Sequence, residues 1–188
     1  MHYYKELKNA KEYIKRAEGF DGKRFIPVLQ KYLKKDSTLL EIGMGPGTDV
    51  DLLSKFYNVT GSDYSQAFLD LYKEKNPNAN LLLLDAVKMD VNEKFDCIYS
   101  NKVMHNLSVK DCKISLQRQL QCLNPHGYLF HSFWFGEGEI EHGEIKYNNY
   151  NFETIREQIT ENLEILELEM YSEMEENDSF YIILQKKF

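Results

Sequence analysis

Short apolar runs and amphipathic stretches alternate along most of the chain. The apolar runs predict five strands, at 39–42, 57–63, 81–86, 94–101 and 128–135. Between them, apolar residues recur at spacings of three and four, which predicts helices over 49–57, 66–75 and 109–122. Strands that alternate with helices form a parallel sheet covered by helices, so the pattern predicts a doubly wound α/β fold. The run at 81–84 is apolar throughout, which predicts a strand buried on both faces.

The two ends of the chain extend this pattern. An apolar stripe over 3–18 predicts a first helix, the glycines of 19–22 break it, and 23–34 predicts a second helix. Near the C-terminus we expect a helix over 152–162 and two strands, at 163–172 and 179–185, which bring the sheet to seven strands. The polar stretch 136–151 follows a strand end. We predict a loop there, either a substrate lid or a disordered excursion.

Composition limits the classes of protein to which the chain can belong. Hydrophobic residues make up 43% and aromatic residues 13% of 188 positions, which is typical of one globular domain. We divide this single domain, 1–188, into a helical cap at 1–35 and a core at 36–188. No apolar run approaches the ~20 residues that span a bilayer, and the N-terminus has no apolar signal core. We therefore expect a cytoplasmic protein without membrane contact.

Charge and cysteine usage narrow the picture further. The net charge of −7 argues against a phosphate backbone as the main partner, since nucleic-acid binders carry a basic surface. Cys97, Cys112 and Cys122 are odd in number and lie in apolar patterns, which predicts reduced thiols in the core. The spacing of Cys and His residues indicates no metal site.

A glycine-rich turn joins the first strand of the sheet to the helix that follows. Gly43, Gly45 and Gly47 alternate there, and glycine lets the backbone turn tightly and lets a ligand approach closely. Pro46 removes a backbone N–H that a pyrophosphate would use. Glu41, two residues before the first glycine, suits a ligand with an ammonium group better than one with a phosphate.

This stretch resembles the first motif of the class I S-adenosylmethionine (SAM) dependent methyltransferases, Glu41-x-Gly43-x-Gly45-x-Gly47. The resemblance covers roughly 37–188. It implies a Rossmann-like, doubly wound seven-stranded sheet with helices on both faces, an antiparallel last strand and an N-terminal helical cap. It also implies SAM as the cofactor and S-adenosylhomocysteine (SAH) as the product.

The resemblance assigns a different part of the cofactor to the end of each of the first three strands. Glu41 faces the methionine amine, Asp63 accepts both ribose hydroxyls, and Asp85 accepts the adenine amino group. Tyr64 faces adenine, and the N–H of Ala86 meets a ring nitrogen. The full set of residues implied to bind the cofactor is Glu41, Gly43, Met44, Gly45, Gly47, Asp63, Tyr64, Asp85, Ala86 and Ser100.

The acceptor side carries weaker signals. His105 follows the fourth strand, where the methyl group is expected to point, so it is our candidate for catalytic contact with the acceptor. Tyr13 and Phe20 in the cap and Trp134 at the fifth strand are candidates for the substrate pocket. For His105, Tyr13 and Phe20, simple packing is the alternative. His131 lies within a strand and is predicted to be a packed histidine.

These patterns predict SAM-dependent methyl transfer to a small molecule. Motifs that recognise SAM do not establish turnover, so a non-catalytic SAM or SAH sensor or partner subunit stays open, as does an enzyme acting on protein or tRNA. A nicotinamide dehydrogenase fits Asp63 but not the glycine spacing or Glu41. Two acidic segments, 137–144 and 173–178, are expected at the ligand edge of the sheet, where they would favour neutral or cationic acceptors, unless they are ordinary solvated loops.

Overall fold

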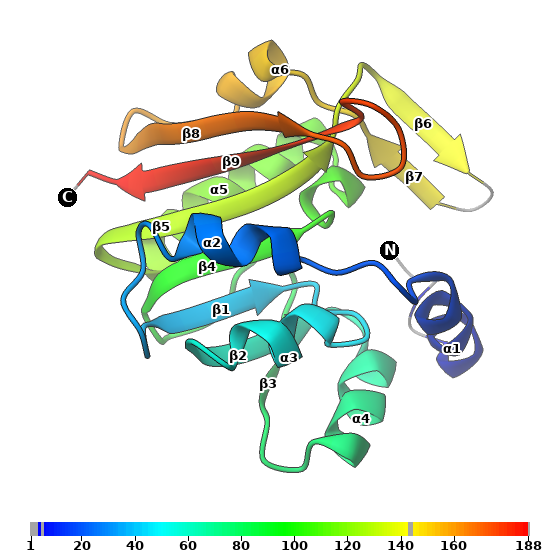
Figure 1. Ribbon diagram of the computed structural model, residues 1–188. Helices are drawn as coiled ribbons and strands as arrows, with labels where there is room; N and C mark the ends of the chain where they lie inside the picture. The colour runs from blue at the N-terminus through cyan, green and yellow to red at the C-terminus, as the bar shows by residue number, and fades with distance from the viewer. Residues whose placement is uncertain (1–3, 5, 143–144, 188) are drawn as a thin grey trace.

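A single seven-stranded sheet organises the computed structural model, which describes residues 4, 6–142 and 145–187. The strands are β1 (Thr38–Ile42), β2 (Asn58–Asp63), β3 (Asn80–Leu83), β4 (Phe95–Asn101), β5 (Leu123–Trp134), β8 (Leu163–Tyr171) and β9 (Ser179–Lys186). They lie in the order β3-β2-β1-β4-β5-β9-β8 (Figure 1). The first five are parallel, whereas β9 runs antiparallel to both β5 and β8. The predicted fold, with its antiparallel last strand, is confirmed.

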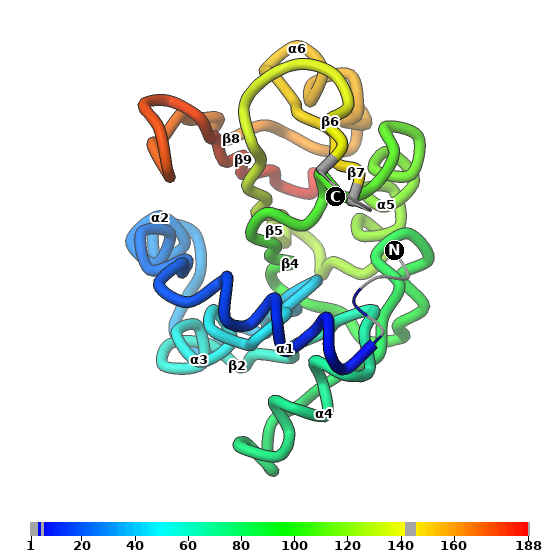
Figure 2. Tube along the Cα trace, turned by 90° about the vertical axis from the view of Figure 1, so that its right-hand side faces the viewer, coloured from blue at the N-terminus to red at the C-terminus, as the bar shows by residue number. Residues whose placement is uncertain are grey.

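Helices cover both faces of the sheet. They are α1 (Leu7–Arg16), α2 (Ile26–Leu29), α3 (Thr48–Leu53), α4 (Gln66–Lys75), α5 (Val109–Cys122) and α6 (Phe152–Arg156), with short 3₁₀ turns η2 (Lys23–Phe25) and η3 (Met104–Asn106). Successive strand residues face opposite sides. Leu39 packs in the cluster that includes α2 and α3, whereas Leu40 packs in the cluster that includes α5 and α6. Figure 2 shows α2 and α3 on one side of the strands and α5 and α6 on the other. Cys97, Cys112 and Cys122 are buried free thiols, as predicted.

The helices of the cap are shorter than predicted. The first covers Leu7–Arg16 instead of 3–18, and residues 3 and 5 lie outside the described part of the chain. The second, expected over 23–34, is the turn η2 followed by α2, which ends at Leu29. Beyond Leu29 the N–H groups of Lys31 and Tyr32 bond three residues back, so the last turn tightens. The helix expected over 152–162 likewise ends at Arg156.

The strand expected at 81–86 was placed wrongly in two respects. It covers Asn80–Leu83, so it ends two residues before Asp85, and it forms an edge of the sheet with one strand neighbour, β2. Leu83 is 61% exposed, so the strand is not buried on both faces. An apolar run does not reveal whether a strand is central or at an edge, and this explains the error.

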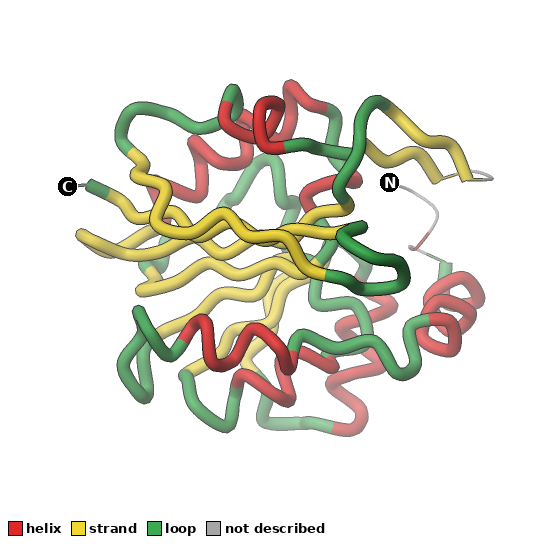
Figure 3. The backbone as a smooth tube through the Cα atoms, turned by 45° about the horizontal axis from the view of Figure 1, so that its top comes forward, coloured by secondary structure: helices red, strands yellow, loops and turns green. Residues whose placement is uncertain are grey.

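The polar stretch 136–151, predicted as a loop, contains regular structure. It contains an antiparallel hairpin of β6 (Glu139–His142) and β7 (Ile145–Asn148), which projects from the sheet (Figure 3). Asn148 Nδ2 donates a hydrogen bond to the Leu107 carbonyl at 2.8 Å, and this contact ties the hairpin to the loop after β4. Among the described helices, none is both long and apolar enough to cross a membrane.

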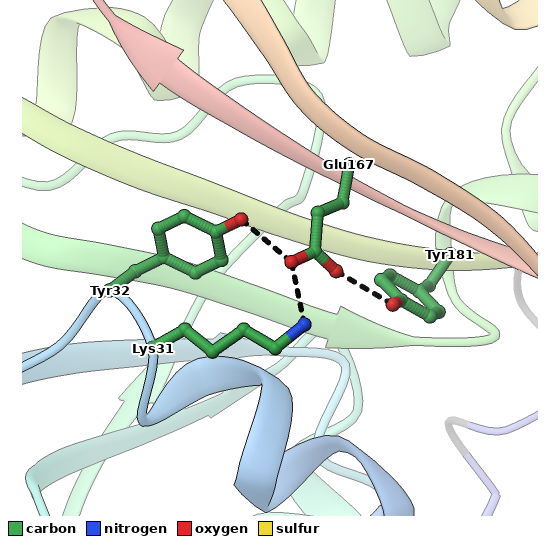
Figure 4. Close-up of polar contacts among 4 residues, drawn as sticks. All are labelled: Lys31, Tyr32, Glu167 and Tyr181. Carbon is green, nitrogen blue, oxygen red and sulfur yellow. Dashed lines mark hydrogen bonds and ion pairs between the residues drawn. The ribbon is translucent and has the colours of Figure 1, made fainter.

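A carboxylate on β8 ties the end of the cap to the sheet. Glu167 accepts hydrogen bonds from Lys31 Nζ at 2.8 Å, Tyr32 Oη at 2.7 Å and Tyr181 Oη at 2.8 Å (Figure 4). Burial raises the pKa of Glu167, but these three donors outweigh burial and hold it below its usual value. The side chain of Lys31 is 56% exposed, so the two tyrosine hydroxyls carry most of the stabilisation.

Glu167→Gln tests this tie. The neutral amide accepts hydrogen bonds more weakly than a carboxylate, so the free energy of unfolding should fall by about 1–3 kcal/mol. Urea denaturation measures the change. Glu169→Gln is the matched control, because Glu169 is exposed and lies on the same face of β8. Equal losses for the two variants would show that the tie contributes nothing specific.

Candidate functional site

The glycine turn after β1 has a backbone that other residues rarely adopt. Gly43, Gly45 and Gly47 have φ values of +67°, +48° and +84°. A Cβ at Gly47 would lie 2.3 Å from the Tyr72 ring, whereas a Cβ at Gly45 would meet its nearest neighbour, the Tyr13 ring, at 3.5 Å. The backbone at Gly45 is therefore the most open part of the turn. Met44, between Gly43 and Gly45, is buried, and its N–H donates a hydrogen bond to the Ser62 carbonyl.

Glu41 is a buried carboxylate next to this turn. It is 4% exposed, and its Oε2 has no hydrogen-bond partner among the described residues. Burial, followed by the nearby charges of Asp49 and Asp63, raises its pKa well above the usual value. A buried acid without a partner is costly, and a cationic ligand group beside it would remove that cost.

Asp63 ends β2 and holds the glycine turn against it. Its Oδ2 accepts a hydrogen bond from the Gly45 N–H at 2.9 Å, and its Oδ1 accepts one from the Ser65 N–H at 2.8 Å. Burial raises its pKa, although these backbone donors act in the opposite direction. The Tyr64 backbone N–H also lowers the pKa of Asp63 by hydrogen bonding. The predicted contact with ribose hydroxyls stays a prediction. Tyr64, the predicted adenine neighbour, follows it and is half-buried.

Asp85 and Ala86 lie in the turn that follows β3. Asp85 is half-buried and its Oδ1 accepts a hydrogen bond from the Val87 N–H at 2.8 Å. The Ala86 carbonyl accepts one from Ser115 Oγ of α5 at 2.5 Å, which fixes the turn against that helix. Both residues are held in place near the end of the third strand, and their contacts with adenine stay predictions.

Ser100 and His131 form a pair inside the sheet. Both are fully buried, and Ser100 Oγ lies 2.8 Å from His131 Nδ1. Burial lowers the pKa of His131 to about 3, so this histidine is neutral and packed, as predicted. The Ser100 side chain is used in this pair, and its predicted role at the cofactor stays untested.

His105 lies in η3, just beyond β4. It is 7% exposed, its Nδ1 has no hydrogen-bond partner among the described residues, and the Tyr147 ring meets it edge-on at 5.6 Å. Burial, with a smaller effect from Lys102, lowers its pKa to about 3. His105 is therefore a neutral imidazole and a weak base, suited to contact with an acceptor rather than to removing its proton.

The three aromatic candidates for a substrate pocket lie apart. Tyr13 lies over Gly45 and packs edge-on against Tyr4 at 5.1 Å and Phe68 at 5.6 Å. Phe20 is 47% exposed. Trp134 ends β5, where its ring face contacts Lys102. The structure thus brings Tyr13 to the glycine turn and Trp134 to the adjacent strand ends.

Residues 39–127 match a protein-family model described as a methyltransferase domain. This segment of the chain is therefore similar to methyltransferase domains. A search of curated proteins finds no match to it.

Solved methyltransferases share the fold over nearly the whole chain. An S-adenosylmethionine-dependent methyltransferase from Clostridium acetobutylicum is 16% identical with a TM-score of 0.77, and the match covers 97% of this chain and 100% of that one. An N-methyltransferase from Bradyrhizobium japonicum with bound SAH is 16% identical with a TM-score of 0.74, and the match covers 100% of both chains. A SAM-bound amino pentose methyltransferase from Micromonospora echinaspora is 14% identical with a TM-score of 0.75, and the match covers 94% of this chain and 96% of that one.

A polar network that the sequence patterns did not predict closes the cap. Asp49, in the first turn of α3, accepts hydrogen bonds from the Gly22 N–H at 2.6 Å, Tyr99 Oη at 2.7 Å and Asn101 Nδ2 at 3.1 Å. Asn101 Oδ1 in turn accepts from Ser132 Oγ at 2.6 Å. The cap, the glycine turn and the ends of β4 and β5 are thus joined. The one feature of the sequence that pointed to this network is the position of the acid Asp49, two residues after Gly47.

Lys102, directly after β4, was also missed. Its φ of +56° places it in the left-handed region, where a residue other than glycine is strained, and such strain is concentrated at functional sites. Its side chain is half-buried, and burial lowers the pKa of its amine to about 7. The sequence offers little signal for it, because lysine is common at exposed strand ends.

Gly22→Ala tests the closure of the cap. Gly22 has an ordinary φ of −87°, so the effect comes from crowding alone. The new Cβ would lie 2.3 Å from Tyr99 Oη and 2.6 Å from Asp49 Oδ2. We expect the free energy of unfolding to fall by about 1–3 kcal/mol, as measured by urea denaturation. The exposed neighbour Lys23→Ala is the control, and an unchanged midpoint for Gly22→Ala would contradict the network's role.

Proposed function

We propose that the protein transfers the methyl group of SAM to a small-molecule acceptor. The observation that carries this proposal is the buried carboxylate of Glu41, whose Oε2 has no hydrogen-bond partner among the described residues, at the start of the turn with the open backbone of Gly45. SAM carries an ammonium and a sulfonium, and either group would be a positively charged partner for the Glu41 carboxylate. None of Glu41, Asp63 and Asp85 suits a phosphate, which counts against a nicotinamide cofactor.

The cofactor side would use the ends of the first three strands. Glu41 would hold the methionine ammonium, the turn at 43–47 would lie along the cofactor, and Asp63 and Asp85 would accept from ribose and adenine. SAM supplies an activated methyl group when bound, so the protein mainly contributes proximity and alignment. The residues fit this division because each acid lies at a different strand end.

The acceptor side would use the ends of β4 and β5. His105 is neutral and would contact the acceptor, while Trp134 would form a wall. The acidic turn 173–178 lies close enough for Glu173 and Asp178 to act electrostatically on Lys102. The second acidic segment, 137–144, includes residues 143 and 144, which lie outside the described residues. Similar solved structures include an N-methyltransferase and an amino pentose methyltransferase, which favours small amine-bearing acceptors.

Calorimetry followed by a methyl-release assay tests the proposal. SAM and SAH should bind and NAD should bind much more weakly, with SAH produced when an acceptor from a panel of small amines, phenols and thiols is present. Asp63→Ala should weaken SAM binding on the order of tenfold, because a charge-assisted hydrogen-bond pair is lost. Tighter binding of NAD than of SAM would contradict the proposal. SAM binding without turnover on any small molecule, protein or tRNA would favour a sensor.

The pH dependence of SAM binding tests the role of Glu41. The pKa of Glu41 is raised in the free protein, and a bound cation would lower it. Binding should therefore release a proton, and affinity should rise as the pH rises through the pKa of the free protein. Glu41→Gln should remove both effects and weaken binding on the order of tenfold. Calorimetry in buffers of different ionisation enthalpy measures the proton release.

The control for this experiment is Glu93→Gln, an exposed acid remote from the glycine turn in sequence. It should retain the proton release of the original protein. If Glu41→Gln releases as many protons on binding as the unaltered protein, Glu41 does not face the cofactor's positive charge.

A further inference from the structure

The amine of Lys102 lies in a small site built from one ring face, one carbonyl and one hydroxyl. Its Nζ is 3.3 Å from the centroid of the Trp134 ring and donates hydrogen bonds to the Phe133 carbonyl at 3.0 Å and to Ser179 Oγ at 2.6 Å. The Tyr171 ring lies farther out, at 5.4 Å. Aromatic faces combined with oxygen acceptors are what proteins use to recognise alkylammonium ligands.

This site lies where an acceptor would enter. It sits beyond the end of β4 and beside the end of β5, and Trp134 pairs with Ser179 at the start of β9. Ligands of open α/β sheets bind outside the carboxyl ends of the parallel strands. Ser179 is fully buried, whereas Lys102, Trp134 and Tyr171 are half-buried. The inner end of the site is therefore buried, and its outer end is accessible to solvent.

We propose that Trp134, Tyr171, Ser179 and the Phe133 carbonyl form the binding site for the amino group of the methyl acceptor, and that the Lys102 side chain fills it until the acceptor displaces it. We call these groups the amine site. The proposal rests on the proposed function and narrows the acceptor to a small primary or secondary amine. The strained backbone of Lys102 is consistent with a side chain held there for a purpose other than stability.

The charges around the amine site suit an amine that must react. Glu173 and Asp178 favour the protonated form, while Arg24, which lies 4.8 Å from the Tyr171 ring, disfavours it. Burial is the largest effect, and together these hold the pKa of the Lys102 amine at about 7 instead of 10.5. An acceptor amine in the same surroundings would be substantially neutral at physiological pH, so its lone pair would be available.

The reaction balances without another reactant. The nitrogen lone pair forms a bond to the methyl carbon, the sulfur–methyl bond breaks, and its electron pair stays on sulfur to give SAH. The methylated nitrogen, now positively charged, then releases its proton to water. Lys102, once displaced, would carry no part of this transfer.

Trp134 is the only tryptophan in the sequence, so its fluorescence reports directly on the amine site. The experiment titrates methylammonium chloride against the full chain, with sodium chloride at equal ionic strength as the reference. Lys102→Met removes the amine from the site and keeps an apolar side chain. The fluorescence of this variant should change saturably with methylammonium concentration. It should bind methylammonium at least tenfold more tightly than the original protein, in which Lys102 competes for the site. Lys102→Gly, which suits the left-handed backbone, should behave in the same way and guards against misfolding of the first variant.

Lys110→Met, at an exposed position of α5, is the control and should match the original protein. Calorimetry with SAH is run on every variant first, and failure of SAH to bind the original protein would overturn the proposed function itself. If SAH binds but neither Lys102 variant gives a saturable, tighter response to methylammonium, the amine site is wrong and the proposed methyl transfer stands.

Discussion

The burial of carboxylates at the carboxyl ends of the strands is the constraint on which the rest of this structure depends. Glu41, Asp49 and Asp63 lie within electrostatic reach of one another, and all three are less than a tenth exposed. Like charges in a poorly solvated place repel strongly. Asp63 is stabilised by the backbone N–H groups of Gly45 and Ser65, and Asp49 by the cap and β4. Glu41 has no comparable set of donors among the described residues, so burial and its acidic neighbours raise its pKa well above the usual value.

Much of the fold could be predicted from the sequence because it depends on local periodicity. The bounds of α4 and α5 match the expected 66–75 and 109–122, since each has a clear apolar stripe and Ser108 begins α5 by accepting a hydrogen bond from the Asp111 N–H. The position of β3 at the edge could not be predicted, because it depends on which strands pair. The hairpin at 139–148 was hidden by its glutamates, whose charge masked the alternation around Ile140.

The candidate site divides in the same way. The glycine turn and the acids at the ends of β1 and β2 are coded by neighbouring residues, so their positions in the fold could be predicted from the sequence. The surroundings of Lys102 depend on contacts between distant segments. The site around Lys102 needs Trp134, Tyr171 and Ser179, which come together only when β9 lies between β5 and β8. Solved structures with 14–16% identity retain the same fold, which indicates that the framework tolerates nearly complete replacement of its side chains.

The position of β9 has a consequence for how the chain is made. The last strand in sequence occupies an interior place in the sheet and pairs along its length with β5 on one side and β8 on the other. During synthesis, both neighbours emerge from the ribosome before their shared partner exists. Each presents an open row of N–H and C=O groups, which is the feature that invites pairing with other chains. The sheet therefore reaches its full width only after β9 has been made, and until then β5 and β8 each present an unpaired edge.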